Sequence, residues 1–453
     1  MKMEMEVQII SKENVKPSSP TPTHQRIFKF SLLDQLLPSS YAPLILFYPM
    51  KKNSTHLKVP SRLSLLKSSL SQTLTWFYPL AGKIKDELSI NCNDEGACFA
   101  EARVSCSLHE FLTQPDLLLI HNKLLPCEFS FKELAPGSYV VCIQANIFSC
   151  GGIAISICIS HKIIDGAALE TFIKGWTSAA RGCNQPIYPN FLSASLFPAN
   201  DELWFKDSSS PMWGSFVRKG SCITRRFVFD SSAIAKLKAE ATSSGVKCPT
   251  RIEVVSAFLW KAMIAASAEL HGFQRPSLLT HLVNLRRTME PSFFTENSLG
   301  NLLWLAAAKY AAESKPEFSN LVSEVKKAVS RIDAQFFRQI KGEEGKSVMS
   351  EFFKTVAEMG SGDEVDCFGF SSWSHFGYYG ADFGWGKPVW VSSIGLTASV
   401  FMNIIILVDT RLGDGIEAWV TLDETDMAIL AGNPELLKLA LLDPSPLLFD
   451  DSV

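Results

Sequence analysis

The 453-residue chain lacks the features of several large classes of protein. It contains no run of about 18 uncharged apolar residues, the length that a membrane-spanning helix needs. Its first ten residues carry charges throughout, unlike the apolar stretch of a signal peptide. Lys and Arg number 43 and Asp and Glu number 46, a net charge of −3, whereas a nucleic-acid-binding surface needs a basic face. We therefore expect neither a membrane protein nor a nucleic-acid-binding protein.

Paired cysteines are also missing from the sequence. The eleven cysteines are scattered and none forms a C-x-x-C motif. A zinc site built on Cys92 and Cys98 would need further His or Cys ligands at a suitable spacing, and we find none, so no metal is expected. Several cysteines stand inside apolar runs, as Cys142 does. Buried free thiols in a reducing compartment explain this pattern best, which predicts a cytoplasmic protein.

Two common catalytic motifs are absent. The chain has no G-x-S-x-G elbow, so no serine nucleophile is well placed for an acyl-enzyme mechanism. Residues 342–347 superficially resemble a phosphate-binding loop. However, Ile340 occupies the place of the first glycine that such a loop requires, and two glutamates would repel a phosphate.

The length exceeds what one ordinary hydrophobic core supports, so two domains are the first expectation. The spacing of apolar residues predicts strands and helices in both halves, an α/β class of fold. We expect strands at 7–10, 139–146, 152–160, 222–229 and 281–285, a hairpin of 89–92 with 97–104, a strand-rich stretch at 390–422, and helices at 60–77, 167–180, 231–243, 250–267 and 317–338. Four prolines and a serine run interrupt residues 183–222, which predicts a linker.

The strongest local signal for chemistry lies at residues 157–166. An apolar strand runs into His161, and Asp165 and Gly166 follow before a helix. A strand end can hold a base rigidly at a cleft, and a histidine accepts a proton near neutral pH. Asp165 has two possible roles: it orients His161, as in a triad, or it caps the helix or forms a structural ion pair. H-x-x-x-D is a short pattern, and a polar histidine without a role is the simpler alternative.

A second signal is the segment D-F-G-W-G at residues 382–386. Gly384 and Gly386 flank Trp385 and allow tight turns of the backbone beside a bulky ring. The simplest interpretation is a structural corner between strands, and the less favoured one makes Asp382 a second acid or base.

The two motifs together resemble the BAHD family of plant acyl-CoA-dependent acyltransferases. The resemblance extends over the whole chain, in the order and at the length usual for the family. It is carried by residues 78–83, 92–94, 150–152, 160–162, 284–286, 300–301 and 415–418. Residues 16–22 and 46–49 are similar to the branch of the family whose members mostly move acetyl groups onto alkaloid alcohols.

The resemblance implies two similar-sized α/β domains of the chloramphenicol acetyltransferase type, joined by a long crossover, with a solvent channel between them. The N-terminal domain would comprise residues 1–182, with about 382–403 returning to it. Residues 183–222 would form the crossover and residues 223–453 the C-terminal domain.

The resemblance also implies roles for single residues. His161 matches the general base, which takes the proton of the acceptor hydroxyl as its oxygen attacks the thioester. Asp165 matches an aspartate that points away from the base and pairs with the arginine that matches Arg286. Asp382 and its motif are mainly structural in the family, as are Gly384, Trp385 and Gly386.

Further positions match the walls of the channel. Ser371 and Trp373 match a segment that lines the channel, where both side chains could donate hydrogen bonds to a developing oxyanion, although Trp373 could simply be packed. Thr250 and Arg251 match a position beside the phosphates of coenzyme A, with an ordinary surface arginine as the alternative. His375 stands where relatives often carry arginine, which disfavours an acidic acceptor.

These observations predict an enzyme that transfers an acetyl group from acetyl-CoA to a hydroxyl of an alkaloid or terpenoid. No permanently bound cofactor is expected, and the partners are the alcohol and the acyl-CoA alone, on a monomer. The alternatives are a longer acyl donor, a sugar or volatile alcohol as acceptor, and a catalytically silent relative that binds a ligand.

Overall fold

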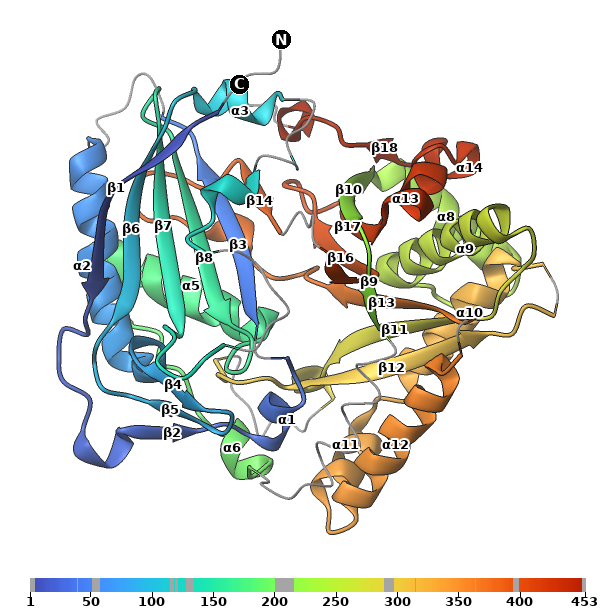
Figure 1. Cartoon of the computed structure of the whole chain (residues 1–453), viewed down its shortest axis with the longest axis horizontal. Helices are drawn as coiled ribbons and strands as arrows, with labels where there is room; N and C mark the ends of the chain where they lie inside the picture. Colours follow the sequence, from blue (N-terminus) through green and yellow to red (C-terminus); the bar gives the residue numbers. More distant parts are fainter. Residues whose placement is uncertain are drawn as a thin grey trace.

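The structure is a computed structural model that describes residues 5–38, 40–50, 58–114, 118, 121–127, 134–199, 216–288, 297–313, 315–362, 364–393 and 399–449. Two large open sheets lie side by side, each with helices packed on the face that points away from the other (Figure 1). The predicted α/β fold class is confirmed.

The first sheet has six strands in the order β1-β6-β7-β8-β3-β14. These are β1 (Val7–Val15), β6 (Ala97–Val104), β7 (Val141–Phe148), β8 (Ile153–Ser160), β3 (Tyr41–Tyr48) and β14 (Trp390–Ser392). Helices α2 (Val59–Trp76) and α5 (Gly166–Ala180) cover one face, since leucines of both pack with Leu44 and Leu46 of β3. β14 comes from late in the chain and pairs antiparallel with β3.

The second sheet has seven strands in the order β12-β11-β13-β16-β17-β10-β18. They are β12 (Leu303–Tyr310), β11 (Ser277–Asn284), β13 (Asp366–Ser372), β16 (Ile404–Asp409), β17 (Ile416–Asp423), β10 (Cys222–Phe229) and β18 (Leu441–Leu442). Its core packs against α8 (Ser231–Ser243), α9 (Arg251–His271), α10 (Phe318–Ser330), α11 (Ala334–Lys341), α12 (Gly345–Gly360), α13 (Glu424–Ala431) and α14 (Pro434–Leu437).

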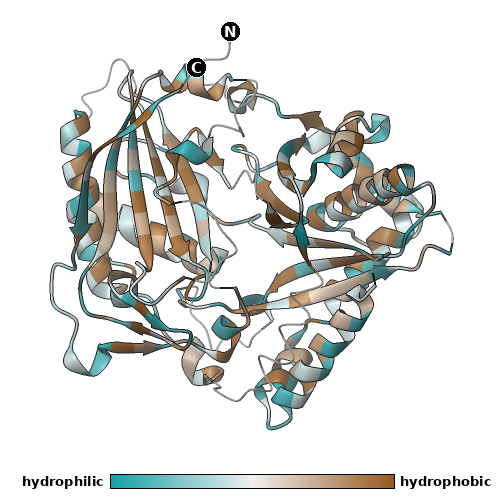
Figure 2. Cartoon of the chain, in the orientation of Figure 1, coloured by the Kyte–Doolittle hydropathy of each residue, from teal (hydrophilic) through white to brown (hydrophobic). Residues whose placement is uncertain are grey.

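A shared apolar cluster joins the facing sides of the two sheets. Ile45 and Phe47 of β3 pack in one cluster with Ile406 of β16, Trp419 of β17 and Trp390 of β14. Figure 2 shows that the strands of both large sheets are mostly hydrophobic, which agrees with burial on both faces.

Smaller elements complete the fold. A three-stranded sheet consists of β2 (Ile27–Lys29), β5 (Ser89–Asn91) and β4 (Lys83–Asp86), and a two-stranded sheet of β15 (Val400–Met402) and β9 (Val217–Lys219). The short helices are α1 (Leu32–Gln35), α3 (Leu108–Leu112) and α6 (Ser193–Leu196). Of the predicted crossover, residues 200–215 lie outside the described residues, as do residues 394–398 of the predicted return.

The prediction of paired strands at 139–146 and 152–160 is confirmed by the antiparallel β7 and β8. The predicted hairpin of 89–92 with 97–104 is wrong, because β5 pairs with β2 and β4 whereas β6 pairs with β1 and β7. Asp94 has a φ of 58° and its carboxylate accepts bonds from Thr21 and Arg26. The turn between the strands is therefore anchored to the N-terminal segment and separates two sheets.

The single helix predicted at 317–338 is two helices, α10 and α11. The side chain of Asp333 accepts a hydrogen bond from the N–H of Phe336 and so starts the second helix. An aspartate at this position competes with helix continuation, because its carboxylate offers the backbone a cap instead.

Candidate active site

His161 directly follows β8 and is held through its backbone by two distant segments. Its N–H donates to the carbonyl of Ser40 at 2.8 Å, and its carbonyl accepts from Nδ2 of Asn301 at 2.8 Å. Asn301 lies just before β12 of the other sheet. The position of His161 thus depends on both halves of the fold.

Burial sets the protonation of the His161 imidazole. Desolvation lowers its pKa below the ordinary value of 6.5, although its own carbonyl, the Asp165 charge and the Asn301 amide act in the opposite direction. Its Nδ1 atom is buried without a hydrogen-bond partner among the described residues. The imidazole is therefore neutral at pH 7 and able to accept a proton.

The Asp165 carboxylate is occupied by structural partners. Oδ1 accepts from the N–H of Ala168 at 2.9 Å and so caps α5, while Oδ2 accepts from Nη1 of Arg286 at 2.6 Å and from the N–H of Leu302 at 2.9 Å. The Asp165 side chain is 0% exposed and that of Arg286 9%. The geometry thus favours the cap and the ion pair over a triad-like role.

Arg286 also supports the loop that carries Asn301. Its Nη2 donates to the carbonyls of Ser298 at 3.0 Å and Gly300 at 2.9 Å. Gly300 has a φ of +110°, and a Cβ there would lie 2.4 Å from Oγ of Ser193, so only glycine suits this position. One arginine therefore ties the helix that follows His161 to the loop that contacts its carbonyl.

Sequence reasoning missed Asn301 and Asp34 as site residues. Oδ1 of the buried Asp34 accepts from the N–H of Asn301 at 2.7 Å and from its Nδ2 at 2.9 Å, which fixes the amide beside His161. Burial raises the pKa of Asp34, against the hydrogen bonds from Asn301 and Ser31. The capping pattern from Ser31 to Asp34 and the pair Gly300–Asn301 were visible in the sequence, but nothing local connects them.

The loop after β13 packs on the start of α5, close in sequence to His161. A Cβ on Gly166 would lie 2.4 Å from Cε2 of Phe376. The hydroxyl of Tyr378 donates to the Gly166 carbonyl at 2.8 Å, and the Gly377 N–H donates to Oε1 of Glu170 at 2.7 Å. This loop therefore forms a wall beside the H-x-x-x-D segment.

Ser371 lies in β13, and Trp373 lies in the loop that follows it. Ser371 is the register partner of Ile406 on β16, so the two side chains share a face. Ile406 packs with Ile45 and Phe47, which places Ser371 on the face toward the six-stranded sheet. Trp373 packs against the core of the six-stranded sheet and against the cluster that the two sheets share.

Asp382 stabilises the turn of its own motif. Its Oδ1 accepts from the N–H groups of Gly384 at 2.8 Å and Gly386 at 2.9 Å. The φ angles of these glycines are 99° and 115°, and the buried Trp385 stacks on Phe383 with ring centroids 5.5 Å apart. These contacts are those of a structural corner.

Thr250 and Arg251 also have structural partners. Thr250 forms a reciprocal capping box with Glu253 at the start of α9. Nη2 of Arg251 lies 3.1 Å from Oδ1 of Asp409, and its Nη1 donates to the Gly413 carbonyl at 2.7 Å. Contact with coenzyme A phosphates stays a prediction for both residues.

Metal-binding clusters and membrane-spanning helices are both absent from the described ranges. There, no group of three or more His, Cys, Asp or Glu side chains is arranged to hold a metal ion. Helices of that part of the chain are all too short or too polar to cross a lipid bilayer.

The two-sheet fold, with a neutral histidine held at a strand end between the halves, defines the class of the H-x-x-x-D acyltransferases. Residues 5–437 match the Transferase family, and the chain belongs to this family of acyl-CoA-dependent acyltransferases. The resemblance noted in the sequence is thus confirmed, and the chain is a transferase that takes its acyl group from an acyl-CoA.

The relatives are plant enzymes that match over nearly the full length. An epi-neemfruitin B 7-O-acetyltransferase of Melia azedarach is 43% identical over 458 residues, which cover 98% of this chain and 100% of the relative. A limonoid 7-O-acetyltransferase of Citrus sinensis is 43% identical over 462 residues, with coverages of 98% and 100%. The crystal structure of vinorine synthase has a TM-score of 0.80 at 33% identity and covers 96% of this chain and 98% of its own.

Proposed function

We propose that this protein is an O-acetyltransferase that moves the acetyl group of acetyl-CoA onto a hydroxyl of a plant terpenoid or alkaloid. The observation that carries the proposal is His161, whose imidazole pKa is lowered by desolvation and whose backbone is held by Ser40 and Asn301. The 7-O-acetyltransferases of limonoids among its relatives favour a terpenoid alcohol of that kind as acceptor.

In the proposed reaction, the imidazole of His161 accepts the proton of the acceptor hydroxyl. The hydroxyl oxygen forms a bond to the thioester carbonyl carbon, whose oxygen becomes negative. The carbon–sulfur bond then breaks, the acetate ester leaves, and the coenzyme A thiolate takes the proton from the imidazolium. Such a general base typically contributes about 10²–10⁴-fold to the rate.

The other residues support this step. Ser371 and Trp373 are proposed to donate hydrogen bonds to the oxyanion, and the orientation of Ser371 toward the six-stranded sheet supports this role. Asp165 and Arg286 are proposed to hold the turn around His161. Asp382 is proposed to stabilise the turn of the D-F-G-W-G segment. Thr250 and Arg251 are assigned to the phosphates of coenzyme A on the resemblance alone.

A screen that crosses acyl donors with alcohols tests the function. The purified chain is incubated with acetyl-CoA, malonyl-CoA or a longer acyl-CoA and with limonoid and alkaloid alcohols, and the esters are weighed by mass spectrometry. We expect acetate esters. The kcat/KM for acetyl-CoA should exceed that for malonyl-CoA by well over about tenfold, and each factor of ten corresponds to about 1.4 kcal/mol. The basis is that residues 371–380 contain no Lys or Arg to receive a malonyl carboxylate.

Equal acetate and malonate esters would show that the donor assignment is wrong. Release of no free coenzyme A with any alcohol would favour a silent ligand-binding relative.

The role of His161 is tested by His161→Ala. We expect a folded protein that has lost transfer by about 10²–10⁴-fold, because no other group then accepts the hydroxyl proton. The rate of coenzyme A release and a melting curve measure the two effects. Retention of more than about a tenth of the wild-type kcat contradicts the role, since it lies far above that range.

We also propose the organisation and location of the chain. Residues 1–182 with about 382–403 form one domain, 183–222 the crossover and 223–453 the other domain, which the pairing of β14 with β3 supports. The eleven free cysteines support a cytoplasmic protein. A monomer is proposed because both sheets and all the residues above come from one chain.

A further inference from the structure

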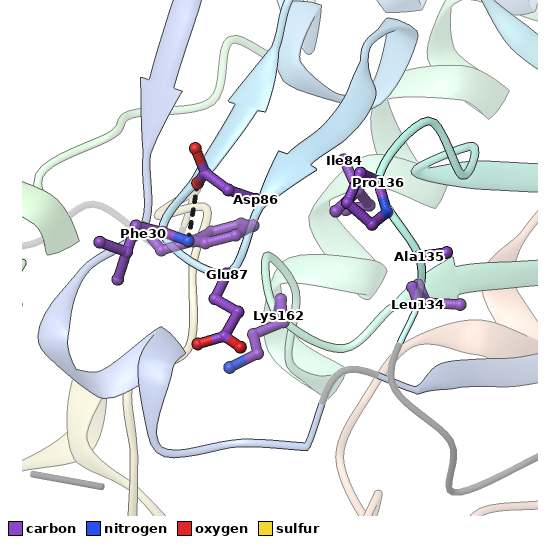
Figure 3. Close-up of a pocket in the computed structure, with 9 residues that line it drawn as sticks. Phe30, Ile84, Asp86, Glu87, Leu134, Ala135, Pro136 and Lys162 are labelled. Atoms are coloured by element: carbon purple, nitrogen blue, oxygen red, sulfur yellow. Dashed lines mark hydrogen bonds between the residues drawn. The ribbon is translucent and has the colours of Figure 1, made fainter.

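A cavity of about 620 Å³ lies between the turn that joins β4 to β5 and residues 134–136 (Figure 3). This volume is within the range of small-molecule sites, about 300–1,000 Å³. The lining residues are Phe30, Ile84, Asp86, Glu87, Leu88, Leu134, Ala135, Pro136 and Lys162. None of the residues proposed for the transfer reaction is among them, so the cavity is distinct from the site around His161.

Lys162 is the buried cation of this cavity. It is 8% exposed, and its Nζ donates to the carbonyl of Gln35 at 3.3 Å. Figure 3 shows the Glu87 carboxylate and the Lys162 amine pointing toward one another. Although Lys162 directly follows His161 in the sequence, its side chain lines this separate space.

The charges at the rim of the cavity are negative. Asp86 and Glu87 are both exposed carboxylates, against one ammonium of Lys162. Oδ1 of Asp86 accepts from the N–H of Leu88 at 2.9 Å and from Oγ of Ser89 at 2.8 Å, so this carboxylate is held in place. The lining therefore carries a net charge of −1, and one of its two carboxylates, that of Asp86, is fixed in position.

The remaining walls are apolar. Phe30 and Ile84 are buried; Ile84 lies beside Pro136, and Leu134, Ala135 and Pro136 lie across from Phe30 (Figure 3). A ligand with an apolar ring system would contact these walls, and a positive charge on it would lie toward the two carboxylates. An anion would meet those carboxylates instead and compete with Glu87 for Lys162.

We propose that this cavity is a second small-molecule site, which binds an apolar ring compound that carries one protonated amine. The proposal does not depend on the transfer reaction, because binding is measured without an acyl donor.

The test measures binding of three matched probes to the full chain saturated with coenzyme A. The probes share a naphthalene ring and differ in charge: 1-naphthylmethylammonium, 1-naphthylacetamide and 1-naphthylacetate. Titration calorimetry gives each Kd. We expect the cation to bind tighter than the neutral amide by about two- to fivefold, the effect of one partly exposed charge pair, and the anion to bind weakest.

Variants locate the probe. Ala135→Trp fills the cavity from its exposed rim and should weaken binding of the cation by more than about tenfold, since the ring then has no room. Glu87→Gln should weaken it by about two- to fivefold, and Lys162→Met should strengthen it by a similar factor because a like charge is removed. Glu343→Gln, an exposed carboxylate elsewhere, is the control and should change nothing.

The opposite signs expected for Glu87→Gln and Lys162→Met make the test decisive. Tightest binding of the naphthylacetate anion would overturn the proposed ligand class. Binding of the cation that Ala135→Trp leaves unchanged would overturn the site itself.

Discussion

At the scale of single residues, burial alone does not make a histidine a base. Desolvation lowers the pKa of both His161 and His281. His281 lies within β11, where its Nδ1 is bonded to the Leu282 carbonyl at 3.0 Å and its ring stacks on Phe370. His161 instead stands just beyond a strand end, with segments of both sheets around it. Position therefore distinguishes two imidazoles whose pKa values are both lowered.

The lowered pKa of His161 predicts the pH dependence of transfer. A base whose pKa is lowered stays neutral to lower pH, so activity is lost only as the pH falls through that lowered value, below 6.5. The midpoint of the acidic limb in the profile of kcat/KM against pH should lie below pH 6.5. An acidic limb centred above the ordinary histidine value would contradict the assigned environment.

Gly166 is predicted to be irreplaceable because of one neighbour. In Gly166→Ala the new Cβ would lie 2.4 Å from the ring of Phe376, so this ring must move. We expect lower activity and a lower melting temperature, although alanine normally favours a helix over glycine by about 1 kcal/mol. The double variant Gly166→Ala with Phe376→Ala should recover part of the loss of stability. If the two losses simply add, the steric explanation is wrong.

At the scale of elements, the start of α5 combines a helix cap with an ion pair between the two halves of the fold. Asp165 caps the helix through Oδ1 and pairs with Arg286 through Oδ2. Because both side chains are nearly excluded from solvent, each charge depends on the other.

Asp165→Asn should therefore lower the free energy of unfolding by about 3–5 kcal/mol, since the Arg286 charge is left buried and unpaired. Arg286→Ala should have a similar effect, and urea unfolding measures both. The matched control is Asp333→Asn in α11, an exposed cap without an ion pair in the part of the chain that the structure describes. Asparagine caps as well as aspartate, so this control should change little. Wild-type stability combined with lost activity in Asp165→Asn would instead favour a role in orienting His161.

At the scale of the whole molecule, a buried charge pair of the seven-stranded sheet contacts a tryptophan of the six-stranded sheet. Nη1 of Arg226 on β10 lies 2.9 Å from Oε2 of Glu417 on β17, and both side chains are almost fully buried. The guanidinium lies 5.1 Å from the ring centroid of Trp390, whose Nε1 donates to Glu417 at 3.3 Å. Trp390 belongs to β14 of the other sheet. The relative position of the sheets therefore depends partly on this cluster.

Glu417→Gln should destabilise the protein by about 3–5 kcal/mol, because the Arg226 charge loses its partner inside the structure. The double variant Arg226→Met with Glu417→Leu should recover most of the stability, since a buried pair is often replaceable by apolar side chains. Melting curves and urea unfolding compare the three proteins. A single variant as stable as the wild type would show that the pair is not structural.

The sequence by itself determined the local parts of this protein. The apolar runs of β7, β8 and β10 and the periodic faces of α2 and α8 each need only neighbouring residues, and their predicted positions agree with the structure to within a few residues. The motif around His161 and the D-F-G-W-G corner are also local, because each is contained in a few consecutive residues.

Only the tertiary structure decided which distant groups meet. The family resemblance implied that Arg286 reaches Asp165, 121 positions away, but no local pattern did. The contact of Asn301 with the carbonyl of His161, across 140 positions, came from the structure alone. The pairing of β5 and β6 with different sheets was equally beyond local patterns. The reason is physical: alternation and periodicity report which face of an element is buried, whereas its partner is selected by packing and by hydrogen bonds that form only when the two sheets come together.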